Sequence, residues 1–298
     1  MTTITSVVPN RESGFKALAK RHPLTAYFVL AYGIMWLVIS PRVVDALGIA
    51  NIPEALSLIS YLLSSLLGPT VAAFWVTGIL EGRAGMRLLL RRTFQVRAGW
   101  QWYLVILFVP LMIWVGAYSF LYNGAPLMGL ISNPSLLLSI FLPNVLIGLL
   151  IPSIGEEPGW RGFALPRLQK LHGPILGTLI LGTLHGIWHL PALLTPMFDP
   201  FTINGFINFV LTAVAASFLY TWVFNNTGGN VWIAIVLHSS GNAAVKLTSE
   251  LIPQDVVLSG WLKVLDSGWL NLIAFGIVAV ILVIMSRGRL GYQPDQTK

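Results

Sequence analysis

The sequence predicts an all-α fold, a polytopic membrane helical bundle of about eight transmembrane helices around an intramembrane polar cavity. Three observations lead to this prediction. The chain of 298 residues is 55% apolar and only 10% charged, whereas soluble domains carry roughly 25% charged residues. Apolar runs recur at about 17–25 residues, the length that crosses a bilayer. The lysines and arginines gather in alternate connecting segments, as the positive-inside rule describes.

Eight apolar segments follow one another along the chain. The fifth and the seventh are short and contain histidine, so their hydropathy is weaker than that of the others. No convincing small-residue cleavage site follows the first segment, so we expect an uncleaved first span rather than a signal peptide. The predicted spans are 24–41, 55–80, 101–122, 135–153, 174–190, 205–224, 231–246 and 268–286.

We expect a single membrane-embedded domain, 23–287, whose functional core is 135–245. Residues 1–22 form a cytoplasmic or interfacial N-terminal tail, and residues 288–298 form a cytoplasmic C-terminal tail. Between the second and third spans, residues 83–97 place arginines beside apolar residues, and tryptophans follow. This pattern predicts an interfacial helix with a face for anionic lipid.

Charge placement predicts the orientation in the membrane. With a cytoplasmic N-terminus, 15 of the 18 basic residues fall on the cytoplasmic side, and only Arg42, Lys246 and Lys263 fall outside. This bias predicts a multi-pass protein of a bacterial-type plasma membrane with both termini cytoplasmic. The net charge of +7 is therefore attributed to the basic cytoplasmic side of a membrane protein. It does not indicate a nucleic-acid partner. The sequence contains no cysteine, which excludes disulfides and thiolate chemistry.

Two adjacent carboxylates, Glu156 and Glu157, stand directly behind the fourth apolar run, in a chain with only 11 acidic residues. An ionised carboxylate buried in an apolar medium costs several kcal/mol unless it is paired. A membrane chain that keeps two of them is therefore expected to use them. Glu157 and Arg161 are four residues apart, which places them on one helical face as an ion pair. Glu156 is left without an obvious local partner.

Three of the five histidines lie inside predicted spans. His185 and His189 are four residues apart, and so are His238 and Asn242, so each pair shares a helical face. Together with the carboxylates, three helices each present a polar stripe. We expect these stripes to meet in one intramembrane cavity, because each would be costly against lipid. A carboxylate, histidines and an asparagine are groups that can activate water and stabilise an oxyanion.

Each of these polar residues also has a structural interpretation. A lone intramembrane histidine often only hydrogen-bonds a neighbouring helix, and this alternative stays open for His185. An asparagine at a helix interface more often joins helices than takes part in catalysis, which applies to Asn242 taken alone. Glu157 and Arg161 are expected to support their neighbour rather than react. The joint occurrence of all these groups favours the functional interpretation.

Three motifs stand in a fixed order along the chain: Glu156-Glu157-x-x-x-Arg161, His189 followed by Leu-Pro, and His238-x-x-x-Asn242. They resemble the ordered motifs of the CAAX-protease and bacteriocin-processing (CPBP) intramembrane proteases, which include the type II CAAX prenyl endopeptidases. The resemblance covers residues 135–245. The chain departs from the family pattern at His185, where the family commonly has phenylalanine. This histidine is a packing substitute, a helper or an extra ligand, and we expect His185→Phe to be tolerated.

The resemblance implies a cone-shaped helical bundle with a cavity that reaches the cytoplasmic side. It implies that Glu156 activates a water molecule and that His189 helps to hold or polarise this water. His238 and Asn242 would stabilise the tetrahedral oxyanion. Each of these roles comes from the family resemblance and not from the spacing of the residues.

Metal dependence stays open at this point. The resembling family has been classed as metalloproteases, and zinc is the cofactor to consider. The candidate ligands are Glu156, His189 and His238, because histidine and carboxylate groups bind zinc. The asparagine of the third motif and the lack of a His-Glu-x-x-His motif do not require a metal. We favour a metal-free glutamate mechanism.

The predicted function is that of an intramembrane endopeptidase acting on a membrane-associated or lipidated protein or peptide, by CAAX-type or bacteriocin-related processing. The expected partners are this substrate and the lipid bilayer, without nucleic acid. Two other classes stay as alternatives. A transporter also places Glu, His and Asn at mid-membrane but usually shows paired half-repeats, and none is visible here. A non-catalytic adaptor with a protease-like fold would be expected to lack part of the motif set, which is complete here.

Overall fold

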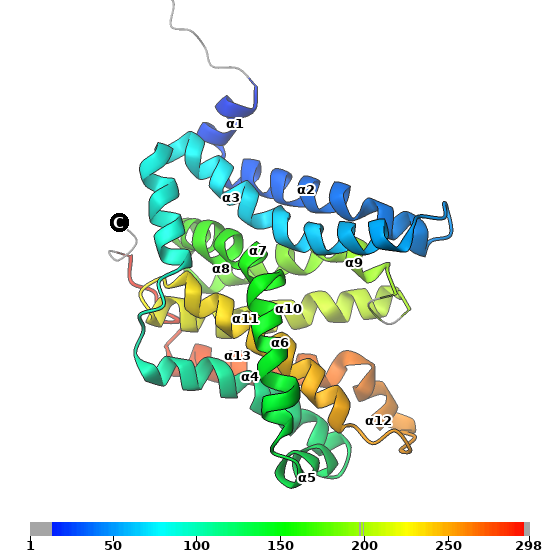
Figure 1. Ribbon diagram of the computed structural model, residues 1–298. Helices are drawn as coiled ribbons and strands as arrows, with labels where there is room; N and C mark the ends of the chain where they lie inside the picture. The colour runs from blue at the N-terminus through cyan, green and yellow to red at the C-terminus, as the bar shows by residue number, and fades with distance from the viewer. Residues whose placement is uncertain (1–13, 197, 199, 295–298) are drawn as a thin grey trace, which may run out of the picture.

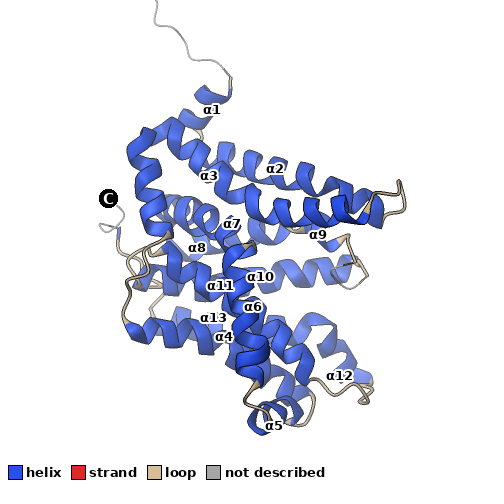
Figure 2. Ribbon diagram, viewed as in Figure 1, coloured by secondary structure: helices blue, strands red, loops and turns tan. Residues whose placement is uncertain are grey.

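The computed structural model describes residues 14–196, 198 and 200–294, and the regular secondary structure of this part is entirely helical (Figures 1 and 2). The predicted all-α class is therefore confirmed. The elements of the described residues are α1 (Phe15–Arg21), α2 (Pro23–Ala46), α3 (Glu54–Thr93), α4 (Trp100–Leu121), α5 (Ala125–Ser132), η1 (Leu137–Phe141), α6 (Leu142–Leu150), α7 (Pro152–Gly159), η2 (Trp160–Ala164), α8 (Leu165–Trp188), α9 (Leu190–Leu193), α10 (Ile203–Asn226), α11 (Val231–Leu251), α12 (Gly260–Val264), η3 (Leu265–Trp269) and α13 (Leu270–Met285).

Within the described residues, five helical stretches are long and apolar enough to cross a membrane: α2, α3, α4, α10 and Gly260–Met285. A sixth is counted when the bent pair Ala125–Ser132 and Leu137–Leu150, at 94° to each other, is taken as one span. These stretches make the chain a polytopic integral membrane protein. The predicted spans 174–190 and 231–246 are helical, in α8 and α11, but they are not among the five. The total of eight spans therefore stays a prediction.

The outward faces of the long helices are apolar. Leu37 on α2, Met112 on α4 and Ile284 on α13 are 76%, 71% and 70% exposed. Contiguous apolar surface of this kind is unfavourable in water, whereas acyl chains solvate it well. Glu156 and Glu157 are buried instead. The bundle thus turns apolar side chains outward and its carboxylate pair inward, as a protein solvated by lipid should.

Two glycines change the direction of the long helices. Gly82 (φ 63°) interrupts α3 and Gly173 (φ 76°) interrupts α8, in positive-φ conformations that glycine adopts without the penalty that a Cβ would impose. The bend in α3 is visible in Figure 1. Beyond it the chain is helical to Thr93, so the helix predicted within 83–97 is observed over most of that range.

The glutamate-bearing helix lies between other helices rather than at the edge of the bundle. α2 and α3 pack along each other, and α7 contacts α3 on one side and α11 on the other. α10 contacts α8, α11 and α13. In Figure 1, α6 and α7 cross in front of this group of helices. This arrangement brings α7, α8, α10 and α11 together at the place where the sequence motifs meet.

Segments at both ends of the described chain pack on the bundle. α1 contacts α2 and α3, and Ala19 is fully buried, so this part of the predicted tail 1–22 is folded. Near the other end, Leu290 is buried, and its carbonyl accepts a hydrogen bond from Asn225 Nδ2 at 3.0 Å. The rest of the two predicted tails, 1–13 and 295–298, lies outside the described residues.

Candidate active site

Two glycines of α7 allow the helix that carries both glutamates to approach α3 very closely. A Cβ on Gly155 would lie 2.5 Å from the Cα of Leu66. A Cβ on Gly159 would lie 2.5 Å from the backbone oxygen of Pro69. Any larger residue would push the helices apart, as at the GxxxG contacts of paired membrane helices. Both glutamates stand between these glycines in sequence, so the contact fixes the backbone that carries them.

A second glycine pair holds the histidine-bearing helix α8 against α10. A Cβ on Gly182 would lie 2.7 Å from the Cα of Val214. A Cβ on Gly186 would lie 2.9 Å from the Cα of Val210. His185 of α8 stands directly before Gly186. The same small-residue spacing therefore fixes the backbone on both sides of the site.

Helix α2 holds the C-terminal turn of α8 in place. Trp36 Nε1 donates to the carbonyl of Trp188 at 3.1 Å, and Trp188 Nε1 donates to the carbonyl of Ala31 at 3.1 Å. The hydroxyl of Tyr32 donates to the carbonyl of Leu184. Trp188 is the last residue of α8, and such terminal carbonyls have no intrahelical partner. These bonds stabilise the turn that presents the histidines.

Glu157 is fully buried and paired with Arg161, as the sequence predicted. Its Oε1 accepts hydrogen bonds from Arg161 Nη1 at 2.9 Å and from His238 Nδ1 at 2.8 Å. The side chains of Arg161 and Glu157 are 2% and 0% exposed. The guanidinium carbon of Arg161 lies 4.4 Å from the centre of the Tyr220 ring. One carboxylate thus ties together α7, η2 and α11, and the arginine adds α10.

Glu156 has a partner that the sequence does not reveal. Its Oε2 lies 3.0 Å from Nε2 of His185, a residue 29 positions later in the chain. The side chains of Glu156 and His185 are 4% and 13% exposed. Helical spacing relates only neighbours on one helix, so it cannot predict a contact between α7 and α8. Phenylalanine cannot make this contact, and whether His185→Phe is tolerated stays a prediction.

His189 is oriented by the end of its own helix. Its Nδ1 lies 3.0 Å from the carbonyl oxygen of His185, and because a carbonyl only accepts, this nitrogen carries the proton. The Nε2 of a neutral ring is then free to accept from water or to bind a metal. The backbone N–H of His189 donates to the carbonyl of Gly186 instead, which leaves the His185 carbonyl to the ring.

His185 of α8, His189 directly after α8 and His238 of α11 lie beside the two glutamates. The ring of His185 has its centre 5.0 Å from that of His189 and 6.5 Å from that of His238. The predicted convergence of the three polar stripes is thus observed for these histidines and for the glutamates of α7. Asn242 lies one turn beyond His238 on α11, and its side chain is exposed. The two predicted oxyanion donors therefore lie on the same helix, His238 in the cluster and Asn242 one turn further along.

Three of the clustered side chains have the composition of a metal site. One ligand atom from each of Glu156, His185 and His189 lies within 4.8 Å of the other two. The sequence suggested His238 as the third ligand, but its Nδ1 contacts Glu157. Two imidazoles and a carboxylate are a donor set of catalytic zinc sites. The three residues therefore fit a divalent metal site in which His185, and not His238, is the third ligand.

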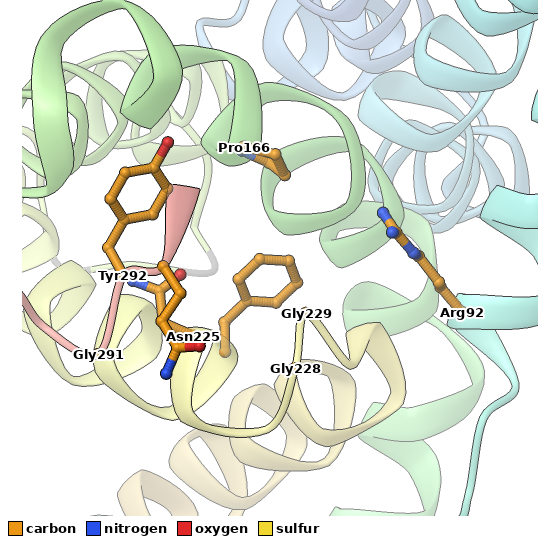
Figure 3. Close-up of a pocket in the computed structure, with 9 residues that line it drawn as sticks. Arg92, Pro166, Asn225, Gly228, Gly229, Gly291 and Tyr292 are labelled. Atoms are coloured by element: carbon orange, nitrogen blue, oxygen red, sulfur yellow. The ribbon is translucent and has the colours of Figure 1, made fainter. Parts of the chain in front are cut away.

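The cavity drawn in Figure 3 is separate from this cluster. It is lined by Arg92, Pro166, Phe224, Asn225, Gly228, Gly229, Gly291, Tyr292 and Gln293. These residues come from the ends of α3 and α10, the start of α8, the turn before α11 and the segment after α13. The glutamates and histidines of the cluster are not among these lining residues, so the polar cavity predicted around them stays a prediction.

Four glycines that position the site carry a signal that is readable in the sequence. Gly155 and Gly159 are four apart, and so are Gly182 and Gly186, which is the GxxxG spacing of close helix contacts. A search for small residues at this spacing would have found both helix contacts. Tyr220, in contrast, is one of many aromatic residues in an apolar chain. Nothing in its local sequence predicts its place beside Arg161.

Comparisons with known proteins agree with the motifs. Residues 138–244 match the family described as Type II CAAX prenyl endopeptidase Rce1-like. The chain is 28% identical over 146 residues to CAAX prenyl protease 2 of Methanococcus maripaludis. This alignment covers 46% of the chain and 49% of the relative, so the chain spans about half the length of the curated protein it matches. The segment 138–244, which carries all three motifs, therefore belongs to the Rce1-like type II CAAX prenyl endopeptidase (CPBP) family.

Proposed function

We propose that this chain is an intramembrane endopeptidase that hydrolyses a peptide bond of a membrane-associated or lipidated protein or peptide. The observation that carries the proposal is the buried carboxylate of Glu156, 3.0 Å from His185 and clustered with His189. A membrane protein keeps such a group at a considerable free-energy cost, which favours a functional role. The family match of the same segment supports peptide hydrolysis as this role.

In the proposed reaction, Glu156 acts as a general base. Its carboxylate removes a proton from a water molecule that also donates to Nε2 of His189. The water oxygen forms a bond to the peptide carbonyl carbon, and an electron pair of the carbonyl moves to its oxygen. The protonated Glu156 then gives its proton to the leaving nitrogen as the carbon–nitrogen bond breaks. One carboxyl group can fulfil both roles because it returns to its starting state.

The negative charge on the tetrahedral intermediate needs donors, and His238 and Asn242 are the proposed ones. Nδ1 of His238 is engaged with Glu157, so its ring offers a second N–H only when both nitrogens are protonated. The carboxylate of Glu157 stabilises this cationic form. The amide of Asn242, one turn further along α11, would supply the second hydrogen bond. Removal of one such donor commonly lowers turnover by about 100- to 1,000-fold.

Glu157 and Arg161 have a supporting role in this proposal, because their mutual contact leaves neither free to react. His185 has a positioning role through its contact with Glu156. A divalent metal held by Glu156, His185 and His189 would supply a polarised water, whereas the steps above use only the side chains of the chain.

The proposed substrate is of CAAX type or a bacteriocin-related peptide, delivered from the bilayer. The matched relative is described as a CAAX prenyl protease, which supports the first class. The apolar outward faces of the helices are suited to a substrate that carries a lipid or a membrane segment. We further propose that both termini are cytoplasmic, which follows from the distribution of basic residues.

The test is turnover of a peptide library by the purified full chain, with Glu156→Gln as the decisive variant. Glutamine keeps the size of the side chain and its hydrogen bonding but lacks basicity, so the variant should fold, bind substrate and fail to cleave it. His238→Ala and Asn242→Ala should each lose about 100- to 1,000-fold in turnover. Glu250→Gln, at an exposed carboxylate, is the matched control. Near-normal turnover by Glu156→Gln would remove the proposed catalytic centre.

A further inference from the structure

Tyr220 of α10 has a hydroxyl group that the packing of the bundle does not use. The side chain is half-buried, and its ring packs against the apolar core. Within the described residues this hydroxyl makes no hydrogen bond, and it is not fully buried. Tyrosine hydroxyls in protein interiors usually have a partner. The polar end of this side chain is therefore available to a molecule that enters the site.

Two contacts place the ring of Tyr220 beside the polar cluster. The guanidinium carbon of Arg161 lies 4.4 Å from the ring centre, and the centre of the His238 ring lies 6.2 Å from it, with the two rings at 80°. The face of an aromatic ring attracts a cation, and Arg161 is itself bonded to the buried Glu157. The buried ion pair therefore stabilises the position of the Tyr220 ring.

The hydroxyl of Tyr220 reaches α11 between the two proposed oxyanion donors. A Cβ on Gly241 would lie 3.5 Å from the hydroxyl oxygen. Gly241 is three residues after His238 and directly before Asn242, and residues three and four apart share one face of a helix. Because glycine has no side chain, this position does not cover the hydroxyl. The hydroxyl thus lies beside the turn of α11 that carries both donors.

We propose that the Tyr220 hydroxyl donates a hydrogen bond to the oxyanion of the tetrahedral intermediate, as a third donor beside His238 and Asn242. This role rests on the proposed peptide hydrolysis. Tyrosine hydroxyls act as such donors in other enzymes. The group donates while it is neutral, whereas His238 needs a second ring proton to do so. Tyr220 keeps its hydrogen throughout, so it adds no proton transfer to those of Glu156.

The test is the steady-state cleavage of a library peptide by the full chain in detergent, with Tyr220→Phe as the variant. Phenylalanine keeps the ring, and loss of a hydroxyl without a partner in the described residues should leave the midpoint temperature of unfolding unchanged. The kcat should fall about 100- to 1,000-fold at unchanged KM, because the bond forms only in the transition state. Tyr292→Phe, at a half-buried tyrosine of the separate cavity in Figure 3, is the matched control and should leave both constants unchanged.

Binding of a tetrahedral anion gives a second readout that needs no turnover. A peptide with a phosphinate group in place of the scissile amide carries the negative oxygen of the intermediate in a stable form. Tyr220→Phe should bind this peptide about 100- to 1,000-fold more weakly than the wild type. In the Glu156→Gln background, Tyr220→Phe should leave the affinity for the substrate peptide unchanged. A loss of packing would weaken the binding of both peptides instead.

The outcomes separate this role of Tyr220 from the proposed function. Wild-type kcat in Tyr220→Phe, a higher KM at unchanged kcat, or an unchanged affinity for the phosphinate peptide would overturn the role of the hydroxyl. The proposed hydrolysis would stand in each case, provided that Glu156→Gln is inactive. A wild-type chain that cleaves no peptide, or an active Glu156→Gln, would remove the proposed function and this role with it.

Discussion

At the scale of single residues, the two neighbouring glutamates are distinguished by their partners. Glu157 contacts a permanent cation and a histidine, and both hydrogen bonds end on the same oxygen. Glu156, within the part of the chain that the structure describes, has one hydrogen-bond partner for its side chain, His185. The two bonds of Glu157 fix its side chain between α7, η2 and α11. The structure thus favours a structural role for Glu157 and a chemical role for Glu156.

Loss of either member of the Glu157–Arg161 pair should destabilise the fold. Glu157→Gln leaves a buried guanidinium without its counter-ion, and Arg161→Ala leaves a buried carboxylate. Removing one member of a buried pair typically costs about 3–5 kcal/mol. In detergent, both variants should therefore unfold at a midpoint temperature well below that of the wild type.

The matched control for this prediction is Glu250→Gln. Lys246 and Glu250 have the same four-residue spacing, but their side chains are 54% and 44% exposed. Solvent screens such a pair, which contributes about 0.3–0.5 kcal/mol on a helix. Wild-type stability of both Glu157→Gln and Arg161→Ala would show that the buried pair contributes nothing to folding.

At the scale of the elements, the site depends on how closely α7 approaches α3 and α8 approaches α10. At these contacts, the atom of the neighbouring helix closest to each glycine is a backbone atom. Close packing of small residues is one of the main sources of association between membrane helices, because lipid tails remove the hydrophobic driving force. The positions of Glu156 and His185 are therefore set by glycines that take no part in chemistry.

Gly159→Ala should move α7, the helix that carries both glutamates. The added methyl group would lie 2.5 Å from the backbone oxygen of Pro69, so α7 must shift away from α3. Overpacking typically costs about 1–3 kcal/mol, and a misplacement of about 1 Å at a reacting group can cost roughly 100-fold in rate. The turnover measured per folded molecule should therefore fall, in addition to any loss of folded protein.

Gly276→Ala on α13 is the control for this substitution. A Cβ at Gly276 meets nothing within 4 Å, and alanine is the better helix former by about 1 kcal/mol. This variant should be as stable as the wild type or more stable, with unchanged turnover. Equal effects of the two substitutions would mean that the α3–α7 contact does not set the geometry of the site.

At the scale of the whole molecule, the long helices have two distinct ends. Figure 1 shows α1 and the end of α13 toward one end of the bundle, whereas the segment between α9 and α10 lies at the other end. The arginine-rich part of α3 beyond Gly82 lies on the side of α1 and the end of α13. The side of the membrane on which this end lies stays a prediction.

Reporter fusions test the orientation. With both termini cytoplasmic, a reporter after residue 298 should be active inside the cell, and one in the segment 195–204 should be active outside. The physical reason is that basic segments are retained on the cytoplasmic side during insertion. Labelling of both positions from the same side would rule out the arrangement with eight spans and cytoplasmic termini.

The sequence by itself determined the helical membrane class, the family of the segment 138–244 and the Glu157–Arg161 pair. Each of these follows from local information: apolar run length, motif order, and four-residue spacing on one helix. The glycine spacing was equally local, and it was readable in principle. The distribution of basic residues also predicted which connecting segments are cytoplasmic.

Only the tertiary structure decided which histidine meets which glutamate. His185 contacts Glu156 from α8, and His238 contacts Glu157 from α11, 81 residues away in the chain. Such pairings depend on the rotation and depth of one helix against another, which helix packing sets rather than helical periodicity. The sequence therefore supplied the groups of the site, and the packing of the helices against one another determined their partners.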